Sequence, residues 1–253
     1  MSKLQFNKVI EADNADQAFT AWWECMLPTK CELDNPDISR DGEVVSEVIN
    51  AITVIKDPTR SFMLNPIRKM SMRYAIGEFL WYLHGNNDLK SIQLYTHNWD
   101  RMSDFGGEVN SNYGWCIKQK YGFNQYKSVL RMLREDLNTR QAVIHIKEPQ
   151  EFISKQLVSK DVNCTVCLQF FVRDMKLHMT TYMRSNDLWL GFPFDIFQFM
   201  NLQVLLCMDL SDLGVTLGTY THHAGSFHLY KRDYLKGIEK MSKASEKLSG
   251  PLA

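Results

Sequence analysis

Residues 164–187 read CTVCLQFFVRDMKLHMTTYMRSND and contain two apolar segments around a short polar turn. Both segments are rich in β-branched and aromatic residues, and 173–176 separates them, which is typical of a β-hairpin. The second segment ends in the polar group 184–187. We therefore expect a sheet built around this hairpin, with polar side chains at the end of one strand.

Helices and strands are expected to alternate irregularly on both sides of the hairpin. Apolar spacing predicts helices over 13–26, 70–84, 123–136, 196–210 and 227–240, strands over 44–55, 142–146 and 214–220, and an ordered loop over 95–115. The chain has no internal repeat and no Pro/Gly/Ser-rich linker. These features favour a mixed-sheet α/β or α+β fold in one domain over residues 1–253.

The composition excludes several classes of protein. Of the 253 residues, 45% are hydrophobic and 23% are charged, as in globular domains and unlike disordered chains. The 29 Lys and Arg balance the 29 Asp and Glu, whereas a protein that binds duplex DNA usually has a basic excess. The sequence shows neither a membrane-spanning apolar run nor a signal peptide. The cysteines are scattered through a chain of this size, which indicates reduced thiols and a cytoplasmic protein. From the balanced charge and the missing apolar run, we expect neither nucleic acid nor a membrane as a partner.

Cys164 and Cys167 have the CxxC spacing of redox and zinc sites. A structural zinc site needs four ligands and no second CxxC exists, while a thioredoxin-like pair begins a helix and these residues lie in a predicted strand. We therefore expect no metal, and a Cys164 thiol that faces a cavity. Arg184 and Ser185 suit a phosphate group, and the guanidinium would also favour a Cys164 thiolate. The alternative for this pair is a solvated strand end with a surface ion pair.

Other polar residues have both a structural and a functional interpretation. Asp195 stands where it could cap the predicted helix that follows it. Glu78 lies in a predicted apolar helix. Either its side chain lies on the one polar face of this helix, exposed to solvent, or it is buried, which would raise its pKa and suit it to proton transfer. His222, His223 and His228 suit hydrogen-bonding or core positions better than a metal site, because adjacent histidines rarely share one face.

Several segments together resemble the thymidylate synthase family over about residues 39–230. They are GEFLWYLHG at 77–85, NYGW at 112–115, the Cys164 strand with its Gln-Phe at 169–170, RSND at 184–187, GFPFD at 191–195 and GSFHLY at 225–230. The resemblance implies a thymidylate synthase-like fold and a homodimer packed through its sheets. It also implies one-carbon transfer from 5,10-methylenetetrahydrofolate to a pyrimidine nucleotide, without a metal.

The resemblance implies a role for each matching residue. Cys164 would attack C6 of the base, Glu78 would organise water and proton transfer, and Tyr113 would assist proton removal at C5. Arg140 would reach the phosphate in the partner subunit's site. The implied nucleotide-binding residues are Arg40, Arg140, Arg184, Ser185, Gln169, Asp195, His228 and Tyr230, with Asp195 also catalytic, and the implied folate-binding residues are Trp99, Asp187 and Gly191.

Three positions depart from the thymidylate synthase pattern. Asp195 replaces an Asn, Thr165 replaces a common His, and Gln141 replaces the second of two Arg. The first two departures, with residues 107–115, resemble the phage deoxycytidylate hydroxymethylase branch. Gln141 matches neither group and removes one phosphate-binding cation.

The base edge explains why Asp195 favours cytosine. Cytosine presents an N3 acceptor beside an N4 donor, whereas uracil presents an N3 donor beside the O4 acceptor. A carboxyl group that holds or shares a proton complements cytosine, and an Asn amide complements uracil. The favoured function is hydroxymethylation of dCMP at C5. The alternatives are hydroxymethylation or methylation of dUMP, hydroxymethylation of CMP, or an RNA-binding module without turnover, which the neutral charge and the retained nucleophile disfavour.

Overall fold

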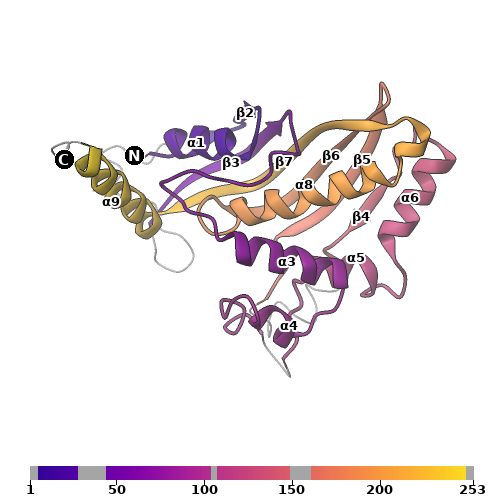
Figure 1. The fold of residues 1–253 in the computed structure, drawn as a ribbon, viewed down its shortest axis with the longest axis horizontal. Coiled ribbons are helices and arrows are strands. Elements are labelled where there is room, and N and C mark those ends of the chain that lie inside the picture. The colour runs from indigo at the N-terminus through magenta and orange to yellow at the C-terminus, as the bar shows by residue number, and fades with distance from the viewer. Residues whose placement is uncertain (1–4, 28–43, 104–106, 149–160, 249–253) are drawn as a thin grey trace.

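The computed structural model describes residues 5–27, 44–103, 107–148 and 161–248 (Figure 1). Its strands form one mixed sheet in the order β1-β3-β7-β6-β5-β4, with β2 also paired to β3. Neighbours β6 and β7 are parallel, while β3–β7, β5–β6 and β4–β5 are antiparallel. The strands are β1 (Gln5–Phe6), β2 (Val9–Ala12), β3 (Val45–Ile55), β4 (Val143–His145), β5 (Thr165–Arg173), β6 (Lys176–Asp187) and β7 (Thr216–Tyr230). The mixed α/β sheet expected from the sequence is thus confirmed.

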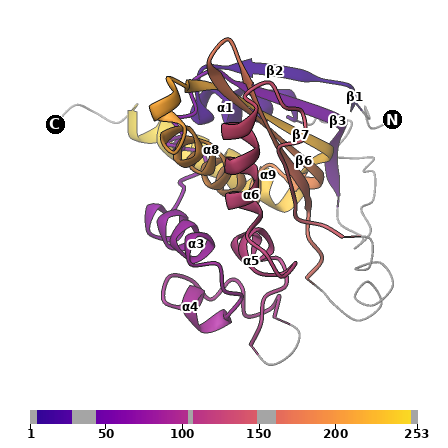
Figure 2. The same cartoon turned by 90° about the vertical axis from the view of Figure 1, so that its right-hand side faces the viewer.

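Helices cover one face of this sheet. Helix α8 runs along β6 and β7, and α3, α4 and α5 form a further layer below it (Figures 1 and 2). The helices are α1 (Ala15–Cys25), α3 (Met72–His84), α4 (Leu89–Gln93), α5 (Tyr113–Lys118), α6 (Gln125–Glu135), α8 (Phe192–Met208), the short 3-10 helix η1 (Ser211–Leu213) and α9 (Lys231–Leu248). None of the described helices is long and apolar enough to cross a bilayer.

Local sequence signals explain where the helices begin and end. Asn14 and Ser71 accept hydrogen bonds from backbone N–H groups in the first turns of α1 and α3. Helix α3 ends at Gly85, which adopts φ 77° and so uses the left-handed conformation that glycine tolerates best. Trp22 of α1 is buried edge-on against Phe227 of β7, with ring centroids 4.8 Å apart, which anchors that helix on the sheet.

The hairpin is present as predicted. Strands β5 and β6 meet at Asp174 and Met175, which have φ values of 52° and 56°. Two consecutive positive φ values are typical of a type I′ turn, one of the two turn types whose twist matches that of the strands in a two-residue hairpin. The register shifts between Thr165 and Cys167, so a bulge lies directly after Cys164.

The opposite face of the central strands is only half-buried, whereas the face toward the helices is closed. Leu168 and Phe170 of β5 are fully buried under the helices. The alternating residues on the other face are partly exposed in β5, β6 and β7; they are Cys167, Gln169, Phe171, His178, Thr180, Tyr182, Thr219, Thr221 and His223. In the single chain, this sheet surface is therefore incompletely covered.

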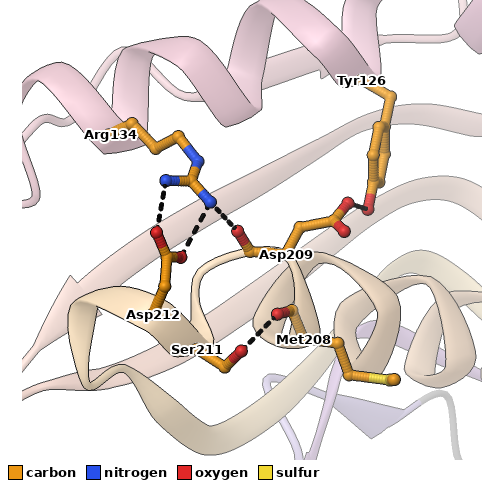
Figure 3. Close-up of polar contacts among 6 residues, drawn as sticks. All are labelled: Tyr126, Arg134, Met208, Asp209, Ser211 and Asp212. Atoms are coloured by element: carbon orange, nitrogen blue, oxygen red, sulfur yellow. Dashed lines mark hydrogen bonds and ion pairs between the residues drawn. The ribbon is translucent and has the colours of Figure 1, made fainter.

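Polar contacts fix helix α6 to the end of α8. Arg134 of α6 donates to both carboxylate oxygens of Asp212, at 2.9 and 2.8 Å, and also to the backbone carbonyl of Asp209 (Figure 3). Tyr126 donates to the Asp209 carboxylate at 2.7 Å. These contacts lie at the outer edge of the helical layer, so they support the scaffold around α8.

Three element boundaries differ from the prediction. The strand expected over 214–220 continues to Tyr230, so 227–230 belongs to β7 and the last helix begins at Lys231. Helix α8 begins at Phe192, which places Asp195 in its first turn rather than at its cap. The segment expected as a loop over 95–115 ends in α5, which begins at Tyr113.

Candidate active site

Three chain segments meet at one end of the sheet and bring the predicted polar residues together. Cys164 immediately precedes β5, and its carbonyl accepts a hydrogen bond from the Arg184 backbone N–H at 2.8 Å. In the parallel pairing of β6 and β7, Ser185 lies beside Ser226 and Asp187 lies beside His228. The register of the sheet therefore places the thiol, the phosphate-binding candidates and the histidine at one edge.

The Cys164 thiol lies next to a guanidinium group. Nη2 of Arg184 is 3.6 Å from Sγ of Cys164. Arg184 is held by donation from Nε to the Asn163 carbonyl at 3.0 Å and from Nη2 to the Val162 carbonyl at 3.0 Å. Among the described residues, no partner is recorded for its Nη1 protons, which leaves a pair of donors for an anion.

Burial and charge act in opposite directions on the Cys164 thiol. Burial raises its pKa, Arg184 lowers it, and Asp195 raises it again, so the net shift is upward. The effect expected of Arg184 is confirmed for that pair of groups, but burial outweighs the guanidinium.

Glu78 is buried within a short chain of hydrogen bonds. Tyr74, one turn earlier on α3, donates its hydroxyl to the Glu78 carboxyl at 2.7 Å, and Gln198 of α8 donates its amide at 2.9 Å. Trp99 donates Nε1 to the Tyr74 hydroxyl at 3.1 Å. Burial raises the pKa of Glu78 to about 7, while the two hydrogen bonds oppose the shift. The carboxyl group can therefore gain or lose a proton near neutral pH.

The catalytic candidate Tyr113 is the first residue of α5. Its buried ring stacks on Phe199 with centroids 5.6 Å apart. Burial raises its pKa strongly, and the charges of Asp195 and Cys164 raise it further. These electrostatic contributions show that Tyr113, Asp195 and Cys164 share one environment, in which the phenol keeps its proton.

Asp195 is held by Asn186 rather than serving as a helix cap. Nδ2 of Asn186 donates to Oδ2 of Asp195 at 2.7 Å. Burial, and then the charge of Glu78, raise the pKa of Asp195 to about 8, so the neutral acid is a major form at pH 7. The actual cap, Gly191, makes no side-chain hydrogen bond. A Cβ atom at Gly191 would lie 2.9 Å from Asn186 Nδ2 and 3.1 Å from Asp195 Oδ2, so only glycine leaves room for this pair.

His228, Tyr230 and Asp187 lie at the same edge of the sheet, whereas Trp99 lies against helix α3. The rings of His228 and Tyr230 meet edge-on, with centroids 5.2 Å apart. Asp187 accepts from the backbone N–H groups of Trp189 at 2.7 Å and of residue 190 at 3.0 Å, which forms the turn into α8. Trp99 packs edge-on against Trp81, with centroids 5.6 Å apart, and remains partly exposed. The described part of the chain contains no cluster of residues suited to a metal ion.

Two candidates lie away from Cys164. Arg140 is exposed before β4, and its carbonyl accepts from the Gln169 amide at 3.2 Å. Gln169 lies five residues beyond Cys164 along the same strand direction, on the half-buried sheet face. Within one chain, these two residues do not reach the thiol. Gln141 is also exposed, and Arg40 lies outside the described residues.

Sequence reasoning missed several residues that hold the candidates in place. Tyr74 was detectable, because it lies four residues before Glu78 and therefore on the same helix face. Gln198 was detectable for the same reason, because it lies three residues after Asp195 in the predicted helix region. The hydrogen-bonding or core position expected for His222 is confirmed, but its contact with Asn186 gave no signal in the sequence, because it depends on the parallel pairing of β6 with β7.

Comparisons with known proteins show which proteins this chain is similar to. The thymidylate synthase family model matches residues 32–250. A deoxyuridylate hydroxymethyltransferase of Bacillus phage SP01 is 30% identical over 204 residues, which cover 76% of this chain and 52% of the relative, about half of its length. A deoxycytidylate 5-hydroxymethyltransferase of Enterobacteria phage T4 is 28% identical over 203 residues, covering 78% of this chain and 80% of the relative.

A solved structure shows the same fold. The thermostable thymidylate synthase A from Bacillus subtilis superposes with a TM-score of 0.69 at 23% identity, covering 90% of this chain and 84% of that protein. At this identity the likeness establishes the fold alone. It agrees with the sheet order and helical layer described above.

Proposed function

The chain belongs to the thymidylate synthase family, a family of one-carbon transferases, and we propose that it hydroxymethylates C5 of dCMP through a covalent adduct with Cys164. The observation that carries the proposal is the placement of Asp195, a carboxyl group with a raised pKa, in the same environment as the Cys164 thiol. Methylenetetrahydrofolate would be the second substrate, and the product would be 5-hydroxymethyl-dCMP. In a phage-infected cell, such a reaction would take place in the host cytoplasm.

The protonation of Asp195 allows its carboxyl group to complement a cytosine base. A neutral carboxyl group can donate its proton to N3 and accept from the N4 amino group. An ionised carboxylate beside uracil would instead place an oxygen against O4. Such a mismatch costs about 1–3 kcal/mol, or roughly 10- to 200-fold in selectivity. One relative is named a deoxyuridylate hydroxymethyltransferase and another a deoxycytidylate 5-hydroxymethyltransferase, so the reaction of dUMP is the second candidate.

The proposed chemistry begins at Cys164 and the phosphate site. The Nη1 donors of Arg184 would bind the nucleotide phosphate together with the Ser185 hydroxyl. Addition of the Cys164 thiolate to C6 opens the C5–C6 double bond and makes C5 nucleophilic. C5 then bonds to the one-carbon group, and loss of the C5 proton lets tetrahydrofolate depart and leaves an exocyclic methylene.

Glu78 is the candidate that decides the last step. Its carboxyl group titrates near pH 7, and in this proposal it positions the water that adds to the methylene group. Water addition gives the hydroxymethyl product, and expulsion of the Cys164 thiolate restores the C5–C6 double bond. In the alternative reaction, hydride transfer from the folate would give a methyl product.

We further propose that the chain forms a homodimer through the half-buried sheet face. The partly exposed side chains of β5, β6 and β7 give this face a surface that a second copy would cover. Gln169 lies on this face and donates to the Arg140 carbonyl, so Arg140 lies beside the face. A dimer would therefore bring the Arg140 guanidinium toward the partner's phosphate site. Sedimentation at several protein concentrations tests this proposal, which a monomer at all concentrations would contradict.

Competitive alkylation of the cysteines tests nucleotide binding at Cys164. Iodoacetamide would label the protein with and without dCMP, and mass spectrometry would follow the peptides that contain Cys164 and Cys25. We expect dCMP to slow labelling of Cys164 but not of Cys25, a partly exposed thiol at the end of α1. The R184Q variant should lose this protection. Equal labelling of Cys164 with and without dCMP would contradict the proposed site.

A further inference from the structure

A buried chain of hydrogen bonds continues from Asp195 into the sheet. Beyond the Asn186–Asp195 contact, Oδ1 of Asn186 lies 3.1 Å from Nε2 of His222. Nδ1 of His222 lies 2.9 Å from the Tyr220 hydroxyl, which lies 3.1 Å from Oγ1 of Thr181. The four supporting side chains are at most 3% exposed. None of them is reachable by bulk water, so their mutual contacts decide their orientation.

These contacts fix the direction of each hydrogen bond. Asn186 points Nδ2 at a carboxyl oxygen, so its Oδ1 faces His222 and needs a donor there. Burial lowers the pKa of His222 to about 3, so the ring is neutral and carries a single proton, which must be on Nε2. Nδ1 is then an acceptor for the single Tyr220 hydroxyl proton, and in this arrangement the Tyr220 oxygen accepts in turn from the Thr181 hydroxyl, since either hydroxyl of that pair can be the donor. With this tautomer, the Asn186 amide cannot flip without placing its NH₂ group against the Nε2–H of His222.

The fixed amide makes the two oxygens of Asp195 unequal. Oδ2 accepts from Asn186 and therefore remains the carbonyl oxygen when the carboxyl group is neutral, so the acidic proton is on Oδ1. A neutral carboxyl group could otherwise pair with either base, because exchanging its O–H and C=O converts the cytosine pattern into the uracil pattern. When the O–H and the C=O are fixed on particular oxygens and the base lies in a given position, the carboxyl group complements either cytosine or uracil, but not both.

We propose that Asn186, oriented by His222, is the specificity-determining positioning residue that decides between cytosine and uracil nucleotides at this site. Asn186 acts on the base through Asp195. This inference rests on the proposed function and adds to it the source of the base preference. The glycine at 191 supports it, because the structure keeps open the space that the Asn186–Asp195 pair occupies.

Two substitutions of His222 test the inference. H222F keeps an aromatic ring, and so the edge-on contact with Phe192, but removes the Nε2 donor that holds Asn186. H222Q keeps an amide N–H near the position of Nε2. The readout is the ratio of kcat/KM for dCMP to kcat/KM for dUMP. We expect H222F to move this ratio toward one by at least about tenfold, equivalent to about 1.4 kcal/mol, and H222Q to restore most of it.

A matched control separates specificity from stability. S61A removes a buried acceptor of Asn201 outside the proposed site, so it should leave the ratio within about twofold of wild type. A folded H222F variant with the wild-type ratio would overturn the inference. If the wild-type protein converts neither nucleotide, the proposed function itself fails.

The tautomer of His222 can be measured without turnover. ¹⁵N NMR of the histidine side chains should show one neutral ring protonated on Nε2 that does not titrate down to about pH 5. H222Q identifies the signal by its loss. A proton on Nδ1, or a ring that titrates near pH 6.5, would overturn the proposed orientation of Asn186 even if H222F fails to fold.

Discussion

Replacing Glu78 with Gln should make the stability of the protein less sensitive to a rise in pH from about 4.5 to about 7. Burial raises the pKa of Glu78 from 4.5 to about 7 in the folded chain. The folded state therefore keeps a proton that the unfolded state releases. As a result, the free energy of unfolding of the wild type falls as the pH rises from about 4.5 to about 7, and the Glu78 contribution is lost above that range. The Gln variant has no carboxyl group to titrate at this position.

The size of the effect follows from the pKa shift. One pKa unit corresponds to about 1.4 kcal/mol, so the Glu78 contribution changes by about 2–3 kcal/mol between about pH 5 and pH 9. A Gln side chain can accept from Gln198 and donate to Tyr74, so both contacts are kept, although the bond that the Tyr74 hydroxyl donates in the wild type is reversed. The free energy of unfolding of E78Q, relative to that of the wild type, should therefore rise by about 2–3 kcal/mol between about pH 5 and pH 9.

Urea denaturation followed by tryptophan fluorescence at three or more pH values measures the difference. E135Q, which changes an exposed carboxylate of α6, is the matched control and should follow the wild-type pH dependence. If E78Q and the wild type lose stability with the same pH dependence, Glu78 does not titrate in this range and the argument from burial is wrong.

Three further substitutions test other parts of the site. C164S should lower turnover by at least about 1,000-fold while dCMP binding, measured by calorimetry, survives; substantial turnover would remove Cys164 from the mechanism. D195N should shift the kcat/KM ratio toward dUMP by roughly 10- to 200-fold, and an unchanged ratio in competition kinetics would leave Asp195 without a role in base recognition. G191A should cost about 1–3 kcal/mol in urea denaturation, because its Cβ would lie 2.9 Å from Asn186 Nδ2, and a wild-type midpoint would show that the pair can move aside.

Local patterns predicted the hairpin and most helices correctly. The apolar spacing of 70–84 and the glycine after it are properties of one helix, so α3 was predictable to within two residues. Strand β7 was predicted too short, because its pairing with both β3 and β6 keeps residues after Tyr220 extended. Asp195 looked like a cap, but Pro193 suits the first turn of a helix, and α8 begins before it.

The sequence also predicted which polar residues meet, but not what orients them. Cys164 and Arg184 were assigned together because a hairpin places them at neighbouring strand ends. The direction of the net pKa shift at Cys164 was not predictable, because it depends on how completely the surrounding chain buries the thiol. The contact of Asn186 with His222 required the register of two parallel strands, which no local pattern contains.

Mass spectrometry of the products from dCMP and dUMP in competition, with methylenetetrahydrofolate, tests the central claim most directly. We predict that the wild-type protein adds a hydroxymethyl group mainly to dCMP, and that C164S, assayed in parallel, gives no product. A methyl product, or a preference for dUMP, would contradict the assignment of Asp195 to a cytosine base and of water to the last step.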